Sequence, residues 1–288
     1  MSYTSRMKNV LPSSVRIGAV HLNAVQPSTL ATFYQHTLGM ELLGEAGQTL
    51  LLGVRGRPLL GIHAATQPPF PGRHTGLFHL ALTYPSRLSL ARAFRRLINL
   101  RSTVQGASDH GVSEAIYLAD PEGNGLELGV DRPAEEWPRA ADGSVQMFTH
   151  PLDLEELLAE DNAATSRPHV DPLVQVSHVH LHVAALTDSI NFYTNIIGFD
   201  IVQHYGESAV FLSAGGYHHH VGLNTWQGVG APQPPPGSPG LAWFEISGVP
   251  LTALRHRLEA AGWNFEELPP NGLLTRDPSG NGVAVLGE

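Results

Sequence analysis

A single carboxylate, Glu127, interrupts a strand-like run that is otherwise apolar. Leu126, Leu128 and Val130 alternate with it, so the run has one apolar face and one face that carries the carboxylate. A carboxylate on a core strand is costly unless it is paired, hydrogen-bonded or bound to a metal ion. Glu127 is therefore a candidate ligand or catalytic group.

Histidines offer donors that could accompany this carboxylate. The run from Val176 to Val183 has period-2 spacing, with His178, His180 and His182 on one face and apolar residues on the other. The chain has no cysteine and 16 histidines. Imidazole and carboxylate groups are thus the strong metal ligands available. The histidine face predicts either a metal site or the polar lining of a cavity.

Composition and charge narrow the class of protein. With 288 residues and 42% hydrophobic content, the chain is long enough for two ordinary domains with a real core. Its formal net charge of −9 argues against a broad nucleic-acid-binding surface. Neither a spanning apolar run nor a signal-peptide pattern is visible, so we expect a cytoplasmic protein without membrane association.

The elements that carry these residues follow a repeated order of one strand, one helix and three strands. This order predicts an α+β fold of four βαβββ modules. The first pair of modules spans 15–130 (15–66 and 75–130), and the second pair spans 173–288 (173–226 and 240–288). A connecting segment, 131–172, joins the two pairs.

Two short motifs occur twice. Phe33-Tyr34 in the first module corresponds to Phe192-Tyr193 in the third, and each pair precedes a glycine that ends the helix. The turn Asp120-Pro-Glu-Gly-Asn-Gly in the second module corresponds to Asp277-Pro-Ser-Gly-Asn-Gly in the fourth. The sequence halves are therefore duplicates. We expect both Phe-Tyr pairs to belong to the helix core.

These repeats resemble the vicinal oxygen chelate superfamily, which includes glyoxalase I, antibiotic-resistance proteins and type I extradiol dioxygenases. The resemblance implies that two βαβββ modules combine into a half-open barrel with a metal ion inside. Three motifs are most similar to two-barrel catechol 2,3-dioxygenases: His110…Tyr117…Glu127, the run from Tyr217, and the strand of His178. The His110–Tyr117 interval is about two residues shorter here than in that family.

The resemblance also implies a metal held by two histidines and one carboxylate. In the four modules the first-strand ligand position holds, in order, Ala19, His79, His178 and Trp243, and the last-strand position holds Glu127 in module 2 and Ala284 in module 4. Only modules 2 and 3 together supply His79, Glu127 and His178. We therefore predict two half-open barrels, with modules 2 and 3 pairing around the metal and modules 1 and 4 pairing without it. His21 is the rival ligand if adjacent modules pair instead.

Further roles follow from the same resemblance. His218, expected on the last strand of module 3 and facing inward, would remove a proton from the diol and later return it, with His220 as the competing candidate. Tyr117 and His110 would donate hydrogen bonds to the bound oxygen species and the substrate. The substrate pocket is expected to include His180, His182 and His220.

The activity implied is Fe²⁺-dependent extradiol cleavage, in which O₂ opens catechol or a substituted catechol to a muconic semialdehyde. Mn²⁺ suits the same ligands, and adventitious Zn²⁺ or Ni²⁺ competes for them. The partners would be a small aromatic diol and O₂, and exposed sheet edges favour a homo-oligomer. One alternative is a glyoxalase-like metal-dependent isomerase or lyase, which typically needs a fourth protein ligand. Another is a non-catalytic protein that binds a small molecule such as an antibiotic, usually without the metal triad.

Overall fold

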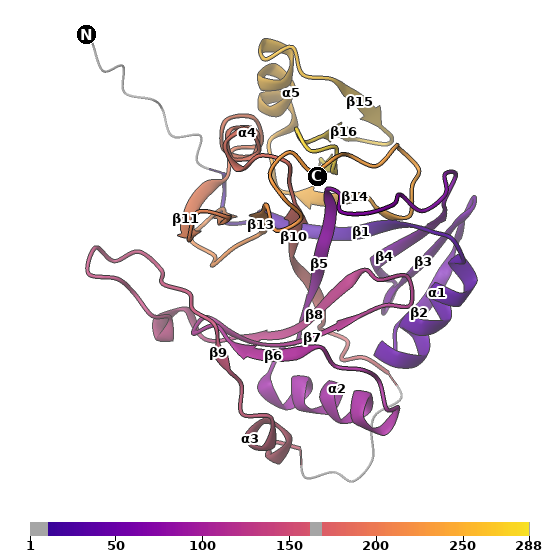
Figure 1. The fold of residues 1–288 in the computed structure, drawn as a ribbon, viewed down its shortest axis with the longest axis vertical. Helices are drawn as coiled ribbons and strands as arrows, with labels where there is room; N and C mark the ends of the chain where they lie inside the picture. The colour runs from indigo at the N-terminus through magenta and orange to yellow at the C-terminus, as the bar shows by residue number, and fades with distance from the viewer. Residues whose placement is uncertain (1–10, 162–168, 288) are drawn as a thin grey trace.

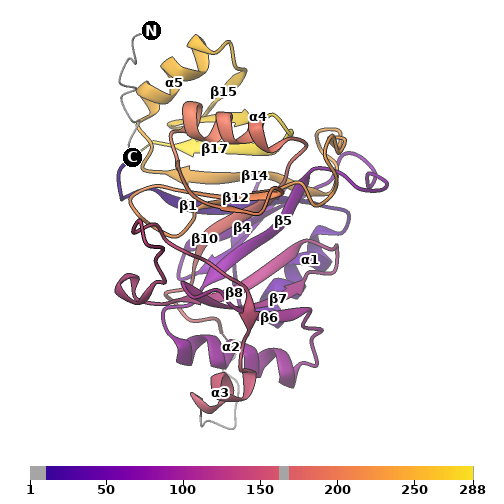
Figure 2. The same cartoon turned by 60° about the vertical axis from the view of Figure 1, so that its left-hand side comes forward.

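Two curled β-sheets form the body of the molecule, with helices at both ends and along one side (Figures 1 and 2). The computed structural model describes residues 11–161 and 169–287. The fold is α+β, as predicted, and the order of strand, helix and three strands occurs four times. Residues 162–168 of the predicted connecting segment lie outside the described residues.

The first half of the chain supplies two modules and the connection that follows them. Module 1 contains β1 (Arg16–Ala24), α1 (Pro27–Phe33), the π-helical turn η1 (Tyr34–Leu38), β2 (Glu41–Ala46), β3 (Thr49–Val54) and β4 (Arg57–Ala64). Module 2 contains β5 (Gly76–Thr83), α2 (Arg87–Asn99), β6 (Gly106–Asp109), β7 (Ser113–Ala119) and β8 (Gly125–Asp131). The connection contains η2 (Ala134–Glu136), β9 (His150–Pro151) and α3 (Leu154–Ala159).

The second half repeats this arrangement. Module 3 contains β10 (Gln175–His182), α4 (Leu186–Asn191), the π-helical turn η3 (Phe192–Ile197), β11 (Asp200–Tyr205), β12 (Ala209–Ser213) and β13 (Val221–Asn224). Module 4 contains β14 (Gly240–Ser247), α5 (Leu251–Ala260), β15 (Phe265–Leu268), β16 (Gly272–Arg276) and β17 (Gly282–Leu286). Within the described residues, no helix has both the length and the apolar character needed to cross a membrane.

Sheet pairing crosses between the halves. Strand β5 pairs antiparallel with β10, in a nine-stranded sheet of order β11-β12-β13-β10-β5-β8-β7-β6-β9. Strand β1 pairs antiparallel with β14, in an eight-stranded sheet of order β15-β16-β17-β14-β1-β4-β3-β2. Modules 2 and 3 thus share one sheet and modules 1 and 4 the other, which confirms the predicted pairing.

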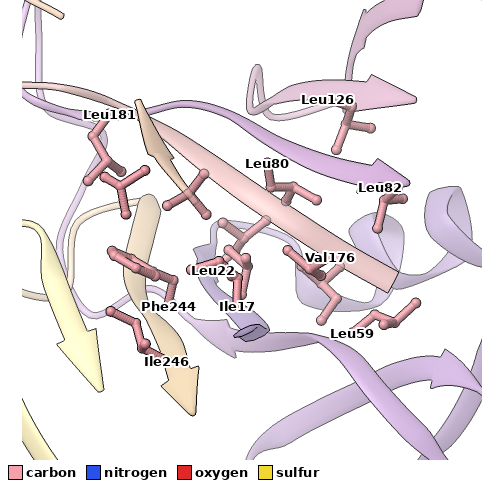
Figure 3. Packing of buried hydrophobic residues seen from close by; sticks show 14 of the residues in the cluster. Ile17, Leu22, Leu59, Leu80, Leu82, Leu126, Val176, Leu181, Phe244 and Ile246 are labelled. Atoms are coloured by element: carbon pink, nitrogen blue, oxygen red, sulfur yellow. The ribbon is translucent and has the colours of Figure 1, made fainter. Parts of the chain in front are cut away.

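The apolar faces of the first strands pack between the two sheets. Figure 3 shows Leu80 and Leu181 from the nine-stranded sheet near Leu22 and Phe244 from the eight-stranded sheet, all buried in one cluster. Successive side chains of a strand point to opposite faces. The histidines that alternate with these core residues therefore face away from the core, toward the hollow side of their own sheet.

The two repeated motifs contact each other. Tyr34 donates a hydrogen bond from its hydroxyl to Asp120 Oδ2 (3.0 Å), and Tyr193 donates one to Asp277 Oδ2 (3.2 Å). Both tyrosines are buried, as expected for helix-core residues. Because modules 1 and 2, and likewise 3 and 4, lie in different sheets, each bond joins a helix on one sheet to a turn of the other.

Candidate metal centre

Three buried side chains from three neighbouring strands converge in the nine-stranded sheet. His79 lies on β5, Glu127 on β8 and His178 on β10, with β5 in the middle. Glu127 Oε2 is 3.2 Å from His79 Nε2 and 3.6 Å from His178 Nε2. One ligand atom from each residue lies within 4.8 Å of the other two. This is the trio predicted from the sequence.

The hydrogen bonding of the trio fits a bound cation. The Nε2 atoms of His79 and His178 are buried and have no hydrogen-bond partner among the described residues. A buried polar atom without a partner is costly. Two ligands at right angles about 2.1 Å from an ion lie about 3 Å apart, close to the separations here. Two imidazoles and one carboxylate suit Fe²⁺ and related divalent ions.

Electrostatics favour the protonation states that a cation needs. Burial lowers the pKa of His79 to about 3, so its imidazole is neutral. Burial alone would raise the pKa of Glu127, but the neighbouring His178 and His79 lower it below the ordinary range, so the carboxylate is ionised. Ser177 Oγ lies 3.2 Å from His178 Nδ1 and orients the ring so that Nε2 meets the other ligands.

A cavity of about 250 Å³ opens beside His79 and Glu127. Large apolar side chains dominate its lining, and none of its lining residues among those described is a lysine or arginine. The lining comprises Phe78, His79, Ser108, His110, Val112, Ser113, Tyr117, Glu127, Met147, Phe148, Thr149, His180, Tyr205, Phe211, His219 and Trp226. The cavity therefore suits a small, largely apolar molecule.

Tyr117 and His110 both line this cavity and contact each other. His110 Nε2 lies 2.7 Å from the Tyr117 hydroxyl, and His110 Nδ1 lies 2.7 Å from the carbonyl oxygen of Phe148. A neutral His110 must donate from Nδ1 to that carbonyl, so its Nε2 accepts from the tyrosine. Burial and the Glu127 carboxylate raise the pKa of Tyr117, which keeps its proton in place.

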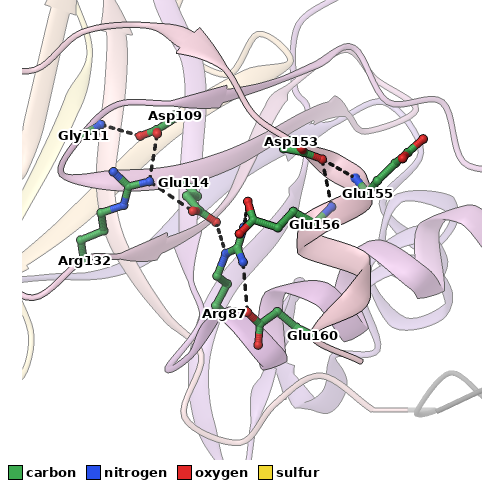
Figure 4. Close-up of polar contacts among 9 residues, drawn as sticks. All are labelled: Arg87, Asp109, Gly111, Glu114, Arg132, Asp153, Glu155, Glu156 and Glu160. Carbon is green, nitrogen blue, oxygen red and sulfur yellow. Dashed lines mark hydrogen bonds and ion pairs between the residues drawn. The ribbon is translucent and has the colours of Figure 1, made fainter. Parts of the chain in front are cut away.

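Ion pairs hold the hairpin that carries His110. Arg132 contacts Asp109 (2.9 Å) and Glu114 (3.2 Å), on either side of the turn between β6 and β7. Arg87 of α2 contacts Glu114 from the other side (2.8 Å), as Figure 4 shows. Arg87 also pairs with Glu156 and Glu160, which ties the connecting helix α3 to the same network.

The histidine run after Tyr217 differs from the expectation. His218 does not lie on a strand: residues 218–220 precede β13, where a bend replaces the regular alternation. His219 lines the cavity, and its ring centroid is 4.0 Å from that of His178. His218 is fully buried and pairs with Asp131 instead, while His220 bonds to Ser213 and lines a separate cavity. The inward position is thus shifted by one residue.

The two remaining pocket candidates, His180 and His182 on β10, lie in different surroundings. His180 lines the cavity, and its buried Nε2 has no hydrogen-bond partner among the described residues. His182 lies two residues further along the same face, beyond the cavity lining. Its Nδ1 lies 2.7 Å from Asn224 Oδ1, so this nitrogen is already hydrogen-bonded within the protein.

The eight-stranded sheet carries a different polar group at the equivalent place. Trp243 stacks on His21, the rival ligand, with ring centroids 4.3 Å apart. His21 lies between Glu245 (3.1 Å from Nε2) and His63 (3.0 Å from Nδ1). Because these neighbours use opposite sides of the His21 ring, they form a row rather than a convergent set. Among the described residues only the trio in the nine-stranded sheet meets the geometry of a metal centre.

Sequence reasoning missed several residues of this site. The sequence pattern does not indicate His219, because in a regular strand its side chain would point outward. Asp131 ends β8, four residues after Glu127 and on the same face, and this spacing could have identified it. Trp226 and Phe211 come from loops and strands whose approach to the cavity depends on the curl of the sheet.

Comparisons with known proteins agree with this geometry. Residues 19–129 match a family model described as a glyoxalase-like domain, and residues 175–285 match the Glyoxalase/Bleomycin resistance protein/Dioxygenase superfamily. A catechol-2,3-dioxygenase of Bacillus subtilis (strain 168) is 40% identical over 256 residues, 85% of this chain and 88% of that protein. This relative confirms the predicted resemblance to extradiol dioxygenases.

Solved structures share the fold at low sequence identity. A putative dioxygenase from Bacillus subtilis subsp. subtilis str. 168 superposes with a TM-score of 0.64 at 15% identity, covering 94% of this chain and 84% of that one. Glyoxalase I from Zea mays superposes with a TM-score of 0.54 at 14% identity, covering 95% and 92%. On its two family-model matches and its 40% identical relative, the chain belongs to the glyoxalase/bleomycin resistance protein/dioxygenase superfamily.

Proposed function

We propose that the chain is an Fe²⁺-dependent extradiol dioxygenase that opens catechols bearing an uncharged ring substituent. The observation that carries the proposal is the buried trio His79, Glu127 and His178: the two histidine Nε2 atoms make no hydrogen bond to the described residues, and His79 and Glu127 line a cavity. When bound there, Fe²⁺ supplies coordination positions for the diol oxygens and O₂, and the redox chemistry of O₂ activation. The catechol-2,3-dioxygenase relative supports this type of enzyme.

The protein side chains manage protons and orientation. His219 lines the cavity next to His178, so it replaces His218 as the group that accepts a proton from a diol hydroxyl and returns it after ring opening. The Tyr117 hydroxyl, held by His110, lies on the same cavity wall. Because its proton is donated to His110, the Tyr117 oxygen is placed to accept a hydrogen bond from a hydroxyl of the diol.

The cavity lining argues for the substrate class. Phe78, Phe148, Phe211 and Trp226 supply flat apolar surface for an aromatic ring, and Met147 adds an adaptable contact. With no lysine or arginine among the described lining residues, an anionic ring substituent would be buried without a partner. Alkyl-substituted catechols are therefore favoured over carboxylated ones.

The cytoplasmic location and the homo-oligomer that the sequence suggests stay predictions.

Oxygen uptake by the anaerobically Fe²⁺-reconstituted protein tests the proposal. We expect uptake and a yellow product with 4-methylcatechol, and much slower uptake with 3,4-dihydroxybenzoate. His178→Ala removes one ligand and should lower both metal content and uptake by about 100-fold or more. The matched control, His21→Ala, changes the other sheet and should retain both.

Two results would contradict the proposal. Uptake that survives in His178→Ala but is lost in His21→Ala would move the site to the eight-stranded sheet. A wild-type protein that holds one metal ion per chain yet takes up no oxygen with any of these diols would instead favour an isomerase.

A further inference from the structure

A row of hydrogen-bonded side chains runs from the cavity beside the candidate metal centre to a second cavity. His219 Nδ1 lies 2.8 Å from His218 Nδ1, and His218 Nε2 lies 3.1 Å from Asp131 Oδ1. Asp131 Oδ2 accepts a hydrogen bond from the Tyr217 hydroxyl at 2.7 Å. The metal trio does not use any of these four residues, and the row joins two separate cavities.

Strand β8 ties this row to the metal centre. Glu127 and Asp131 are four residues apart on β8, so their side chains point to the same face. Asp131 also lines a second cavity of about 400 Å³, and its side chain keeps 27% of its exposure. Burial would raise the pKa of Asp131, but the hydrogen bonds from His218 and Tyr217 lower it below its ordinary value. Asp131 is therefore the anionic end of the row.

With both imidazole rings neutral, the hydrogen bonds of the row allow one arrangement of protons. The ionised Asp131 can only accept, so His218 carries its proton on Nε2. With one proton on that ring, His218 Nδ1 is bare and must accept from Nδ1–H of His219. The single proton of a neutral His219 therefore lies on Nδ1. Its Nε2, which receives no hydrogen bond from the described residues, is then an open acceptor.

We propose that Asp131, acting through His218, is a positioning residue that fixes the tautomer of His219 so that this cavity-lining histidine presents an unprotonated Nε2. The inference deepens the proposed function, because an unprotonated Nε2 is what His219 needs to accept a proton from a diol hydroxyl. The tautomers themselves do not depend on which reaction the site performs.

Nitrogen-15 NMR of histidine-labelled protein, loaded with diamagnetic Zn²⁺, measures the tautomers directly. The signals of His218 and His219 are assigned from His218→Gln and His219→Gln. We expect a protonated Nδ1 and a bare Nε2 for His219, and the reverse for His218. A wild-type His219 with a protonated Nε2, or a His218 with both nitrogens protonated, would overturn the proposal whether or not the enzyme cleaves catechols.

Asp131→Asn should invert the row. The Tyr217 hydroxyl donor then takes the amide oxygen, and the amide NH₂ group faces His218 Nε2, which must become an acceptor. Protons shift accordingly, and His219 carries its proton on Nε2. Tyr217→Phe keeps the ring and the carboxylate, so it should keep the wild-type tautomers. Unchanged tautomers in Asp131→Asn would refute the role of Asp131.

Kinetics separate positioning from general damage to the fold. In Asp131→Asn we expect kcat for 4-methylcatechol to fall about 100-fold or more, as misplaced tautomers do in other enzymes, with KM changed less than about threefold. The control variant Asp200→Asn changes an exposed carboxylate on β11 and should leave both constants unchanged. Inverted tautomers with an unaltered kcat would also overturn the proposal.

Discussion

The protonation of His63, in the eight-stranded sheet, makes the stability of the fold depend on pH. Burial and the neighbouring His21 lower the pKa of His63 from 6.5 to about 4. Between these values the unfolded chain binds a proton at this position and the folded chain does not. The contribution of His63 to stability is therefore complete above pH 6.5 and is lost as the pH falls toward 4.

A variant isolates this contribution. His63→Gln keeps a hydrogen-bonding side chain but does not titrate, so its free energy of unfolding should fall less steeply between pH 6.5 and 4.5 than that of the wild type. Urea unfolding at several pH values measures the slope. His204→Gln, at an exposed position, is the control and should follow the wild type. Equal slopes for all three proteins would show that His63 titrates normally in the fold.

At the same scale, the sequence predicts the trio His79, Glu127 and His178, but it does not predict that His219 lines the cavity. His79, Glu127 and His178 lie inside regular strands, where alternation determines which way each side chain points. Residues 218–220 precede β13 and lie outside the regular strand, so the orientation of their side chains depends on the contacts of His218 with Asp131 and of His220 with Ser213. Such tertiary partners leave no periodic pattern in the sequence.

Among the elements, the parallel pairs β10–β13 and β1–β4 share one packing device. His180 pairs with Gly222 and His21 with Gly61, and each histidine ring lies over the glycine of the neighbouring strand. A Cβ at Gly222 would lie 2.8 Å from His180 Cδ2, and one at Gly61 would lie 2.2 Å from His21 Nδ1. Glycine is needed at both places because the rings occupy the space of a side chain.

Gly222→Ala should therefore displace His180 toward the cavity. We expect the free energy of unfolding to fall by about 1–3 kcal/mol from overpacking. The variant should also show a higher KM for 4-methylcatechol, because the ring intrudes on the substrate space. Gly61→Ala should destabilise the chain similarly without changing KM. Gly106→Ala, at an exposed strand position with open space for a Cβ, is the neutral control. An unchanged KM in Gly222→Ala would argue against His180 as a pocket wall.

At the scale of the whole molecule, each sheet contains strands from both halves of the chain, so each half needs the other to complete its sheets. The first half supplies His79 and Glu127, the second supplies His178, and the central pair β5–β10 joins them. A chain cut between Asp142 and Gly143, which are exposed, loses no sheet pairing within either sheet.

Co-expressed fragments 1–142 and 143–288 should thus associate and bind metal in a one-to-one complex. Either fragment alone should expose unpaired first strands and aggregate. Size-exclusion chromatography with metal analysis measures both outcomes, and the uncut chain is the reference. A fragment that folds and binds metal alone would contradict this dependence.

The pairing of modules could be predicted because ligand-capable residues fall only in modules 2 and 3. The path of the connection could not, since its course depends on ion pairs such as those of Arg87 with Glu156 and Glu160. The sequence also does not predict the contact between the two repeated motifs, in which Tyr34 bonds to Asp120 and Tyr193 to Asp277. Each motif alone indicates only a helix end or a turn.

The two antiparallel strand pairs that join the halves, β1–β14 and β10–β5, follow the same symmetry. His21 is opposite Trp243 across β1–β14, and His180 is opposite His79 across β10–β5, so the equivalent positions of the duplicated halves meet in the same register. The two halves are thus related like the subunits of a two-fold symmetric dimer that have exchanged modules. Here both halves belong to one polypeptide. Two identical subunits would be obliged to carry the same site twice, whereas a fused pair can keep the ligands in one barrel and tryptophan and alanine in the other.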